Sequence, residues 1–203
     1  LLENFCSMLD ALLRFFQQAG MRVLGIDPAR AIAAEATHHG IPTRCEFFSL
    51  PLAETLCHEG WRADVIAANN VFAHVDDLQS IVDGVAALLK PSGLFVFEVS
   101  YVLDVVEQGL FDTIYHEHLS YHTVKPLVGL FERHGMRLVD VQQVNTHGGS
   151  IRGLAALASS RWTPRTRIAE LIGQEERAGL YDPLTYQRLF DRIQELKRQL
   201  VGL

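Results

Sequence analysis

Residues 63–100, "ADVIAANNVFAHVDDLQSIVDGVAALLKPSGLFVFEVS", predict a strand–helix–strand unit. The first eight residues are typical of a strand buried on both faces, and the last seven form a second apolar strand. Between them the pattern predicts an amphipathic helix that begins after Asp76 or Asp77 and ends before Pro91 and Gly93. Two apolar strands joined through a helix indicate a parallel pair.

The same alternation continues on both sides of this unit. It predicts an α/β fold with a doubly wound, mostly parallel sheet, an antiparallel hairpin at the sheet edge, and C-terminal helices. Helices are expected at 1–20, 29–40, 52–59, 124–135, 163–179 and 183–203, and strands at 21–27, 41–48, 136–144 and 150–159.

Composition narrows the class of protein. The chain has 203 residues, 48% of them hydrophobic, which suits one sizeable globular domain with some appended helix. A formal net charge of −6 argues against a nucleic-acid partner, and no apolar run approaches the ~20 residues that span a membrane. The three separated cysteines, Cys6, Cys45 and Cys57, suggest a reducing compartment such as the cytoplasm.

Several polar residues follow predicted strands, where open parallel sheets bind their ligands. Asp27 has two interpretations: its carboxylate accepts both hydroxyls of a ribose, or it caps the helix that follows Pro28. Glu46 either meets an adenine amino group or is an exposed charge. A dinucleotide site is not indicated, because "NFCSML" at 4–9 occupies the place of a glycine-rich turn.

The segment "FDTIYHEHLSYH", residues 111–122, gathers three histidines, a glutamate and two tyrosines. Metal binding would need His116 and His118 together with a distant third ligand, either His74 or His147. Proton transfer suits the set better, because histidine titrates near neutrality and a tyrosine hydroxyl can stabilise an oxyanion. A polar loop without a chemical role is the third interpretation.

Two further histidines are candidates for the same crevice. His74 follows a predicted strand by a few residues and either projects over the sheet edge or caps a helix. His147 lies in the turn "THGGS", where Gly148 and Gly149 either let backbone amides approach a ligand or simply form a hairpin turn.

The motifs "GIDPA", "AANNVFAHV", "GLFVFEVSY", "FDTIYHEH" and "THGGSIR" occur in this order along the chain. Together they resemble the S-adenosylmethionine (SAM)-dependent C-methyltransferases of deoxysugar biosynthesis, over roughly residues 11–200. That family methylates a ring carbon of a nucleotide-linked keto-deoxysugar. The resemblance implies a class I methyltransferase fold, which is Rossmann-like, and a small-molecule substrate.

The resemblance also implies a three-part protein with a zinc-binding domain, a methyltransferase domain and a C-terminal α/β domain. Residues 1–160 are expected to be the methyltransferase domain without its first strand and glycine loop, because "CSMLD" at 6–10 does not match that loop. Residues 161–203 are expected to be a helical segment leading toward the third part. Zinc is expected only in the first part, and no metal site in this chain.

Positions that match the family motifs carry expected roles. Asp27 would bind the cofactor ribose, Glu46 and Phe47 would lie at the adenine, and Asn69 would lie near the methionine moiety. The expected catalytic residues are Tyr115, Glu117, His118 and His74.

The implied mechanism is enolate formation. His118 would take a proton from the carbon beside the ketone, Tyr115 or His74 would hydrogen-bond the developing oxyanion, and Glu117 would orient His118. The alternatives are O- or N-methyl transfer on a small molecule, a non-catalytic nucleotide-sugar or protein-binding module, and a metal-dependent hydrolase.

Overall fold

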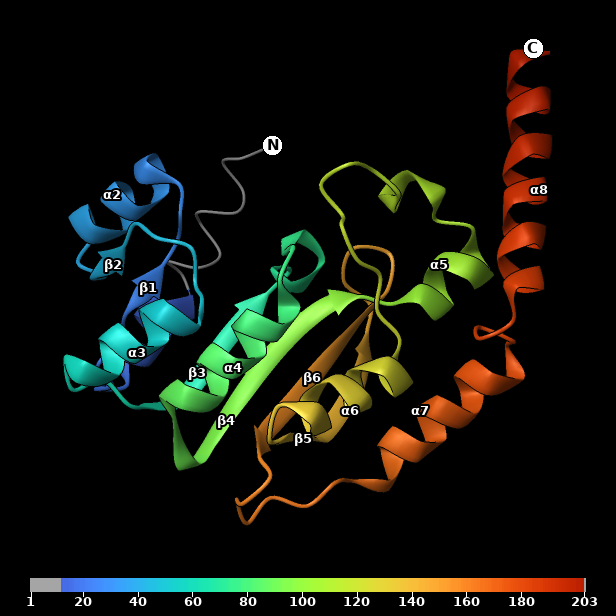
Figure 1. The fold of residues 1–203 in the computed structure, drawn as a ribbon. Helices are drawn as coiled ribbons and strands as arrows, with labels where there is room; N and C mark the ends of the chain where they lie inside the picture. The colour runs from blue at the N-terminus through green and yellow to red at the C-terminus, as the bar shows by residue number, and fades with distance from the viewer. Residues whose placement is uncertain (1–11, 203) are drawn as a thin grey trace.

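A computed structural model describes residues 12–202 of the chain as a mixed α/β fold (Figure 1). A helix over residues 12–18 is followed by the labelled elements, which include two short 3₁₀ turns, η1 (Phe72–His74) and η2 (Phe111–Thr113). The others are β1 (Gly25–Ile26), α2 (Arg30–His38), β2 (Thr43–Arg44), α3 (Leu50–His58), β3 (Ala63–Asn69), α4 (Leu78–Leu88), β4 (Leu89–Ser100), α5 (Val102–Gln108), α6 (Val124–Arg133), β5 (Met136–Val144), β6 (Ser150–Leu157), α7 (Thr166–Arg177) and α8 (Pro183–Val201).

The main sheet has the strand order β3-β4-β6-β5, and β1 and β2 form a separate parallel pair. β3 and β4 run parallel, whereas β6 runs antiparallel to both β4 and β5. The predicted α/β class and the antiparallel hairpin at the sheet edge are therefore confirmed. Figure 1 shows α4 and α6 across one face of this sheet, where both helices contribute to the same hydrophobic core.

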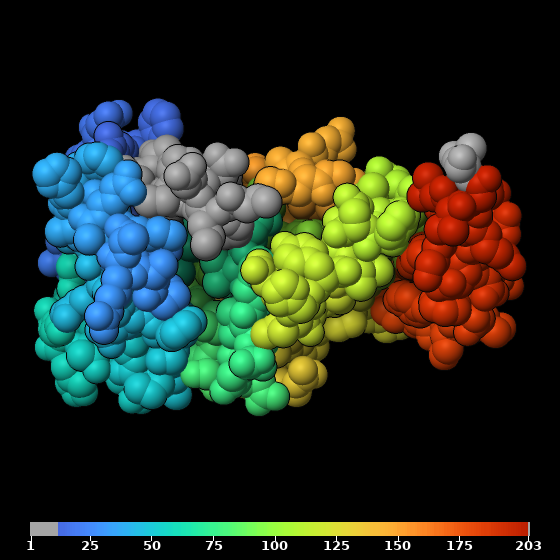
Figure 2. All heavy atoms as spheres, turned by 90° about the horizontal axis from the view of Figure 1, so that it is seen from above, coloured from blue at the N-terminus to red at the C-terminus, as the bar shows by residue number. Residues whose placement is uncertain are grey.

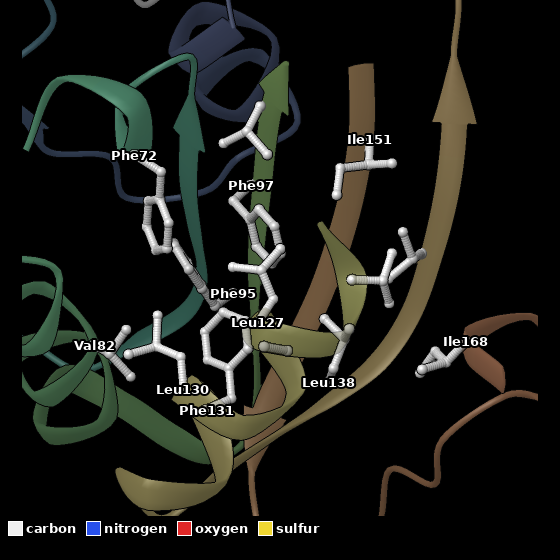
Figure 3. Packing of buried hydrophobic residues seen from close by; sticks show 14 of the residues in the cluster. Phe72, Val82, Phe95, Phe97, Leu127, Leu130, Phe131, Leu138, Ile151 and Ile168 are labelled. Atoms are coloured by element: carbon white, nitrogen blue, oxygen red, sulfur yellow. The ribbon is translucent and has the colours of Figure 1, made fainter. Parts of the chain in front are cut away.

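An aromatic cluster lies at the centre of that core (Figure 3). Phe95 and Phe97 of β4 meet Phe131 of α6 and Phe72 of η1, and the Phe72 and Phe97 rings stack with centroids 5.4 Å apart. Each such aromatic pair contributes about 0.5–1.5 kcal/mol beyond the area that it buries. Because Phe72 is anchored in this way, the core also fixes the residues that follow it in η1.

Two predicted features of the central unit are wrong. The helix ends at Leu88, before Pro91 as predicted, but the strand expected to begin at Leu94 begins at Leu89. The ladder shifts register between Ala63 and Val65, so that β4 starts early and its pairing passes over residues 90–93. β3 is not buried on both faces, since Val65 is 41% exposed. Within residues 12–202 this strand pairs on one side only, so it is an edge strand.

Other predicted elements are confirmed or shortened. Asp77 is the N-cap of α4, with its side chain accepting a hydrogen bond from the Ser80 amide. The strands expected at 21–27 and 41–48 shrink to the two-residue pair β1 and β2. α8 has no buried residue, although its first turns lie beside α5. No helix in the described part of the chain is long and apolar enough to cross a membrane.

Candidate active site

The histidine-rich segment lies at the carboxyl ends of β3 and β4. η1 follows β3, α5 follows β4, and residues 111–122 return from α5 to the end of β4, where His122 forms a bridge with Tyr101. Seen from above, the segment around residues 110–122 (yellow-green) lies beside the turn at 145–149 (orange) on one face of the molecule (Figure 2). This edge of an open α/β sheet is where such folds bind ligands.

Both ring nitrogens of His118 have identified partners. Nδ1 lies 2.8 Å from the carbonyl oxygen of Thr113, and Nε2 lies 3.1 Å from the hydroxyl of Tyr115. A carbonyl only accepts hydrogen bonds, so Nδ1 carries the proton of the neutral imidazole. Nε2 therefore keeps its lone pair and accepts from Tyr115, which makes Nε2 the basic atom of the ring.

His74 lies next to His118, with ring centroids 4.9 Å apart. Its Nδ1 donates a hydrogen bond of 2.9 Å to the carbonyl oxygen of Glu117. The two rings are therefore oriented in the same way, because the Nδ1 of each is bonded to a main-chain carbonyl of residues 113–117. The structure brings together three predicted residues, Tyr115, His118 and His74.

The loop that carries His118 is tied to η1 by its own backbone. The amides of Leu119 and Ser120 donate to the carbonyl oxygen of Ala73 at 2.7 and 3.3 Å. The Ser120 hydroxyl donates to the carbonyl of Phe72 at 3.2 Å. Because the aromatic core fixes Phe72, these bonds hold the loop at a defined height above the sheet.

The buried side chain of His122 supports this loop. It is 6% exposed, and its Nε2 lies 3.1 Å from the hydroxyl oxygen of Ser120. Burial lowers the pKa of His122 to about 4, so the ring is neutral at physiological pH. Of the three histidines in the segment, His122 is the one that supports the loop.

The Glu117 side chain is not positioned to orient His118 in this structure. Residues 115–118 form a turn, in which the His118 amide donates to the Tyr115 carbonyl, and the Glu117 carboxylate points to solvent with 63% of the side chain exposed. Its nearest identified partner is His116 Nε2 at 4.0 Å, and His116 is itself 89% exposed. The backbone of Glu117 serves the site instead, because its carbonyl holds His74.

Sequence reasoning missed Thr113 and Ser120. The Thr113 carbonyl accepts from His118 and also, at 3.4 Å, from the hydroxyl of Tyr121.

Tyr121 lines an apolar cavity of about 370 Å³ between α5, the loop and α8. The remaining lining residues are Val102, Val105, Val106, Ile114, Thr123, Pro126, Leu180, Tyr181, Tyr186 and Leu189. The sequence gives one signal for this region, which is the position of Tyr121 next to His122.

The turn at His147–Gly149 is packed closely against α5. His147, Gly148 and Gly149 have φ angles of 51°, 84° and 137°, and the Gly149 amide donates to the Thr146 carbonyl. A Cβ on Gly149 would lie 2.4 Å from the Asp104 carboxyl group, so glycine is needed for close packing. The Gly149 amide is therefore bonded within the turn and is not offered to a ligand.

The predicted cofactor residues lie at the ends of β1, β2 and β3. Asp27 Oδ1 accepts from the Ala29 amide at 2.8 Å, so one carboxylate oxygen stabilises the start of α2. Glu46 and Phe47 follow β2 on the surface, and Phe47 is 78% exposed. Asn69 ends β3 opposite Glu98 of β4.

These residues fit the nucleoside end of SAM. The second carboxylate oxygen of Asp27 suits a ribose hydroxyl, and the uncovered ring of Phe47 suits stacking on a purine. The segment at 6–10, expected to replace the glycine loop, lies outside the described residues. Among residues 12–202, no group of three or more His, Cys, Asp or Glu side chains is arranged to hold a metal ion.

Comparison with solved structures identifies the fold class of this chain. A chain in the complex of the Haloferax volcanii Trm112 methyltransferase activator with a methyltransferase superposes with a TM-score of 0.58 at 14% identity, covering 74% of this chain and 80% of that one. Magnesium protoporphyrin IX methyltransferase of Synechocystis PCC 6803, solved with bound S-adenosylhomocysteine, gives 0.52 at 15% identity over 68% and 65% of the two chains. The fold is that of the class I SAM-dependent methyltransferases.

Sequence comparison identifies the family. The chain belongs to the methyltransferase-domain family, whose model matches residues 5–141, and residues 145–203 match the model of the C-methyltransferase C-terminal domain. The C-methyltransferase NovU of Streptomyces niveus is 38% identical over 200 residues, which are 98% of this chain and 48% of NovU. A ubiquinone biosynthesis O-methyltransferase of Bordetella avium is 33% identical over 82 residues, or 39% of this chain and 34% of that protein. The chain thus spans about half the length of NovU and a third of the second relative.

Proposed function

We propose that this chain is the methyltransferase part of an enzyme that transfers a methyl group from SAM to a carbon. The acceptor is the carbon next to the ketone of a nucleotide-linked deoxysugar. The observation that carries the proposal is the basic Nε2 of His118, which lies beside a tyrosine hydroxyl and a second imidazole. The similarity to NovU, whose name describes a C-methyltransferase, supports transfer to carbon.

The chemistry requires a base because a carbon next to a ketone is not nucleophilic until it loses a proton. Nε2 of His118 takes that proton, and the positive charge on the ring is then stabilised through Nδ1 by the Thr113 carbonyl. The Tyr115 hydroxyl, which donates to Nε2 before substrate binds, turns to the ketone oxygen and stabilises the enolate, aided by His74.

SAM, when bound, supplies the electrophilic methyl group that the enolate carbon accepts. Asp27 would hold its ribose, Glu46 and Phe47 its adenine, and Asn69 its methionine end. The residues of this chain bring acceptor and donor together at one sheet edge, and good orientation of two reactants is worth about 7–11 kcal/mol of barrier.

The test follows the substrate proton. A nucleotide-linked keto-deoxysugar is incubated with the intact protein in heavy water, with and without SAM, and NMR reads exchange of the proton next to the ketone and the position of any new methyl group. We expect exchange that His118→Asn abolishes, and a product with a new carbon-bound methyl group. A methyl group on oxygen or nitrogen, with the carbon-bound proton retained, would establish the alternative transferase activities instead.

Calorimetry with SAM separates the enzyme from a binding module. An enzyme of this class binds SAM, and Asp27→Ala weakens the binding. Absence of SAM binding to the intact protein, together with binding of the nucleotide-sugar, would identify a non-catalytic module.

A further inference from the structure

A buried carboxylate in α7 takes no part in the chemistry proposed above. Glu175 is 0% exposed, although it belongs to a helix whose other faces are polar. A buried charge costs several kcal/mol unless hydrogen bonds replace its lost water. The partners of Glu175 therefore indicate what the residue does.

Four donors surround this carboxylate. Oε1 accepts from the Tyr101 hydroxyl at 3.0 Å and from the Val124 amide at 2.5 Å. Oε2 accepts from the Lys125 amide at 3.3 Å and from the Tyr181 hydroxyl. Val124 and Lys125 are the first residues of α6, so the carboxylate also lies at the positive end of a helix.

These bonds bracket the end of the histidine-bearing loop. The loop leaves His122 and enters α6 at Val124, whose amide Glu175 holds. On the other side, the backbone of Tyr101 pairs with His122, and the Val102 amide donates to the His122 carbonyl at 3.1 Å. The Glu175 carboxylate thus holds both segments that adjoin His122, one through the Tyr101 hydroxyl and the other through the Val124 amide.

We propose that Glu175 is a positioning residue that couples the C-terminal segment of the chain to the catalytic loop. Glu175 holds residues 122–125 in place. His122 in turn contacts Ser120, and the backbone of this loop holds His118 against His74. The inference rests on the proposed function in one respect only, namely that this loop is catalytic.

The same contact reaches the apolar cavity. Tyr181 bonds Glu175 and also lines the cavity of about 370 Å³ beside the loop. Tyr181 therefore connects the wall of this cavity to the carboxylate that holds the start of α6.

Hydrogen exchange tests the coupling without any need for turnover. Glu175→Gln places an amide NH₂ group against a backbone N–H donor, and Glu176→Gln is the matched control, because Glu176 is the exposed neighbour that pairs with the Lys125 ammonium group. We expect exchange of the Leu119 amide to rise at least about tenfold in Glu175→Gln. The Phe97 amide in β4 and all positions in Glu176→Gln should stay near the wild-type rate.

Turnover of the intact protein gives the second readout. We expect kcat for methyl transfer to fall about tenfold in Glu175→Gln while the KM for SAM stays within about twofold, because the loop and not the cofactor site is displaced. Tyr181→Phe, which deletes one donor, should shift both readouts in the same direction and carries the test if Glu175→Gln does not fold.

Three results would overturn the coupling: unchanged Leu119 exchange, an equal rise in Glu176→Gln, or a rise spread evenly over β4 and β6. A protein that shows the expected local exchange but no methyl transfer in any variant would contradict the proposed function and leave the coupling supported.

Discussion

The hydroxyl of Tyr115 lies 3.1 Å from Nε2 of His118, three residues further along the same turn. The opposite ring nitrogen donates to the main-chain carbonyl of Thr113. The two nitrogens of one imidazole thus have separate tasks, since one fixes the ring and the other presents a lone pair.

Replacing His118 with asparagine removes the proposed base. We expect kcat to fall about 10²–10⁴-fold, the usual contribution of a positioned general base, with SAM affinity unchanged. A radiolabelled methyl-transfer assay and calorimetry measure the two quantities. His116→Asn is the control, because His116 is exposed and two positions away. Near-normal turnover in His118→Asn would exclude the residue as the base.

Tyr115→Phe keeps the ring and deletes the hydroxyl beside Nε2. We expect kcat to fall about 10²–10³-fold, the typical effect of losing one oxyanion donor, with little change in the KM for SAM. Tyr121→Phe provides the comparison, since the Tyr121 hydroxyl bonds the Thr113 carbonyl and not Nε2. Equal losses in the two variants would show that the hydroxyl of Tyr115 has no special role.

Asp27→Asn separates the two interpretations of this residue. Asparagine keeps the oxygen that accepts from the Ala29 amide but loses the second acceptor offered to a ribose. We expect SAM to bind about tenfold or more weakly by calorimetry, with the thermal midpoint nearly unchanged. Asp64→Asn, at an exposed ion pair with Lys90, should leave the affinity unaltered. Full affinity in Asp27→Asn would mean that the residue only stabilises the start of α2.

Gly149→Ala should destabilise the fold by about 2–4 kcal/mol in urea denaturation, because the methyl group meets Asp104 and the φ of 137° is unfavourable for alanine. Gly135→Ala is the control for φ alone. Gly135 has a φ of 67° with open space around its Cβ position, so we expect a loss of about 1 kcal/mol. Equal losses would mean that contact with Asp104 contributes nothing.

His122 should make the fold sensitive to acid. Its folded pKa of about 4 lies below the ordinary 6.5, so the unfolded chain takes up a proton first as the pH falls below 6.5. The resulting loss of stability between pH 7 and pH 5 is about 2 kcal/mol. It levels off below pH 4, where the folded state is protonated as well. Urea denaturation of His122→Asn should show a correspondingly smaller loss, and identical pH dependence in the two proteins would contradict this assignment.

The longer elements of the fold could be predicted from the sequence. β5, β6 and α6 fall where periodicity and glycine punctuation indicate, and Asp77 caps α4 as one of two candidates. The early strands are shorter than predicted, because apolar runs around Gly25 and Thr43 carry no sign of how many residues find a pairing partner. The sequence does not reveal the start of β4, because Leu89 pairs with Ala63 while the residues around Pro91 bulge out of the ladder.

The sequence predicted which three side chains cluster at this sheet edge, but not the groups that hold them there. Tyr115, His118 and His74 meet as expected, since chemistry-bearing side chains gather where parallel strands end. The carbonyls of Thr113 and Glu117 leave no trace in the sequence, because every residue has one. Glu175 lies on the same stripe of α7 as the buried Ile168 and Leu171, but glutamate is normally solvated, so its burial is clear only from the tertiary structure.

Main-chain carbonyls hold both imidazoles, and this arrangement separates the base from the surface around it. A substitution at position 117 changes what faces an incoming molecule, yet the oxygen that holds His74 stays in place. Substitutions on this surface can therefore alter its shape and charge while both imidazoles keep their orientation.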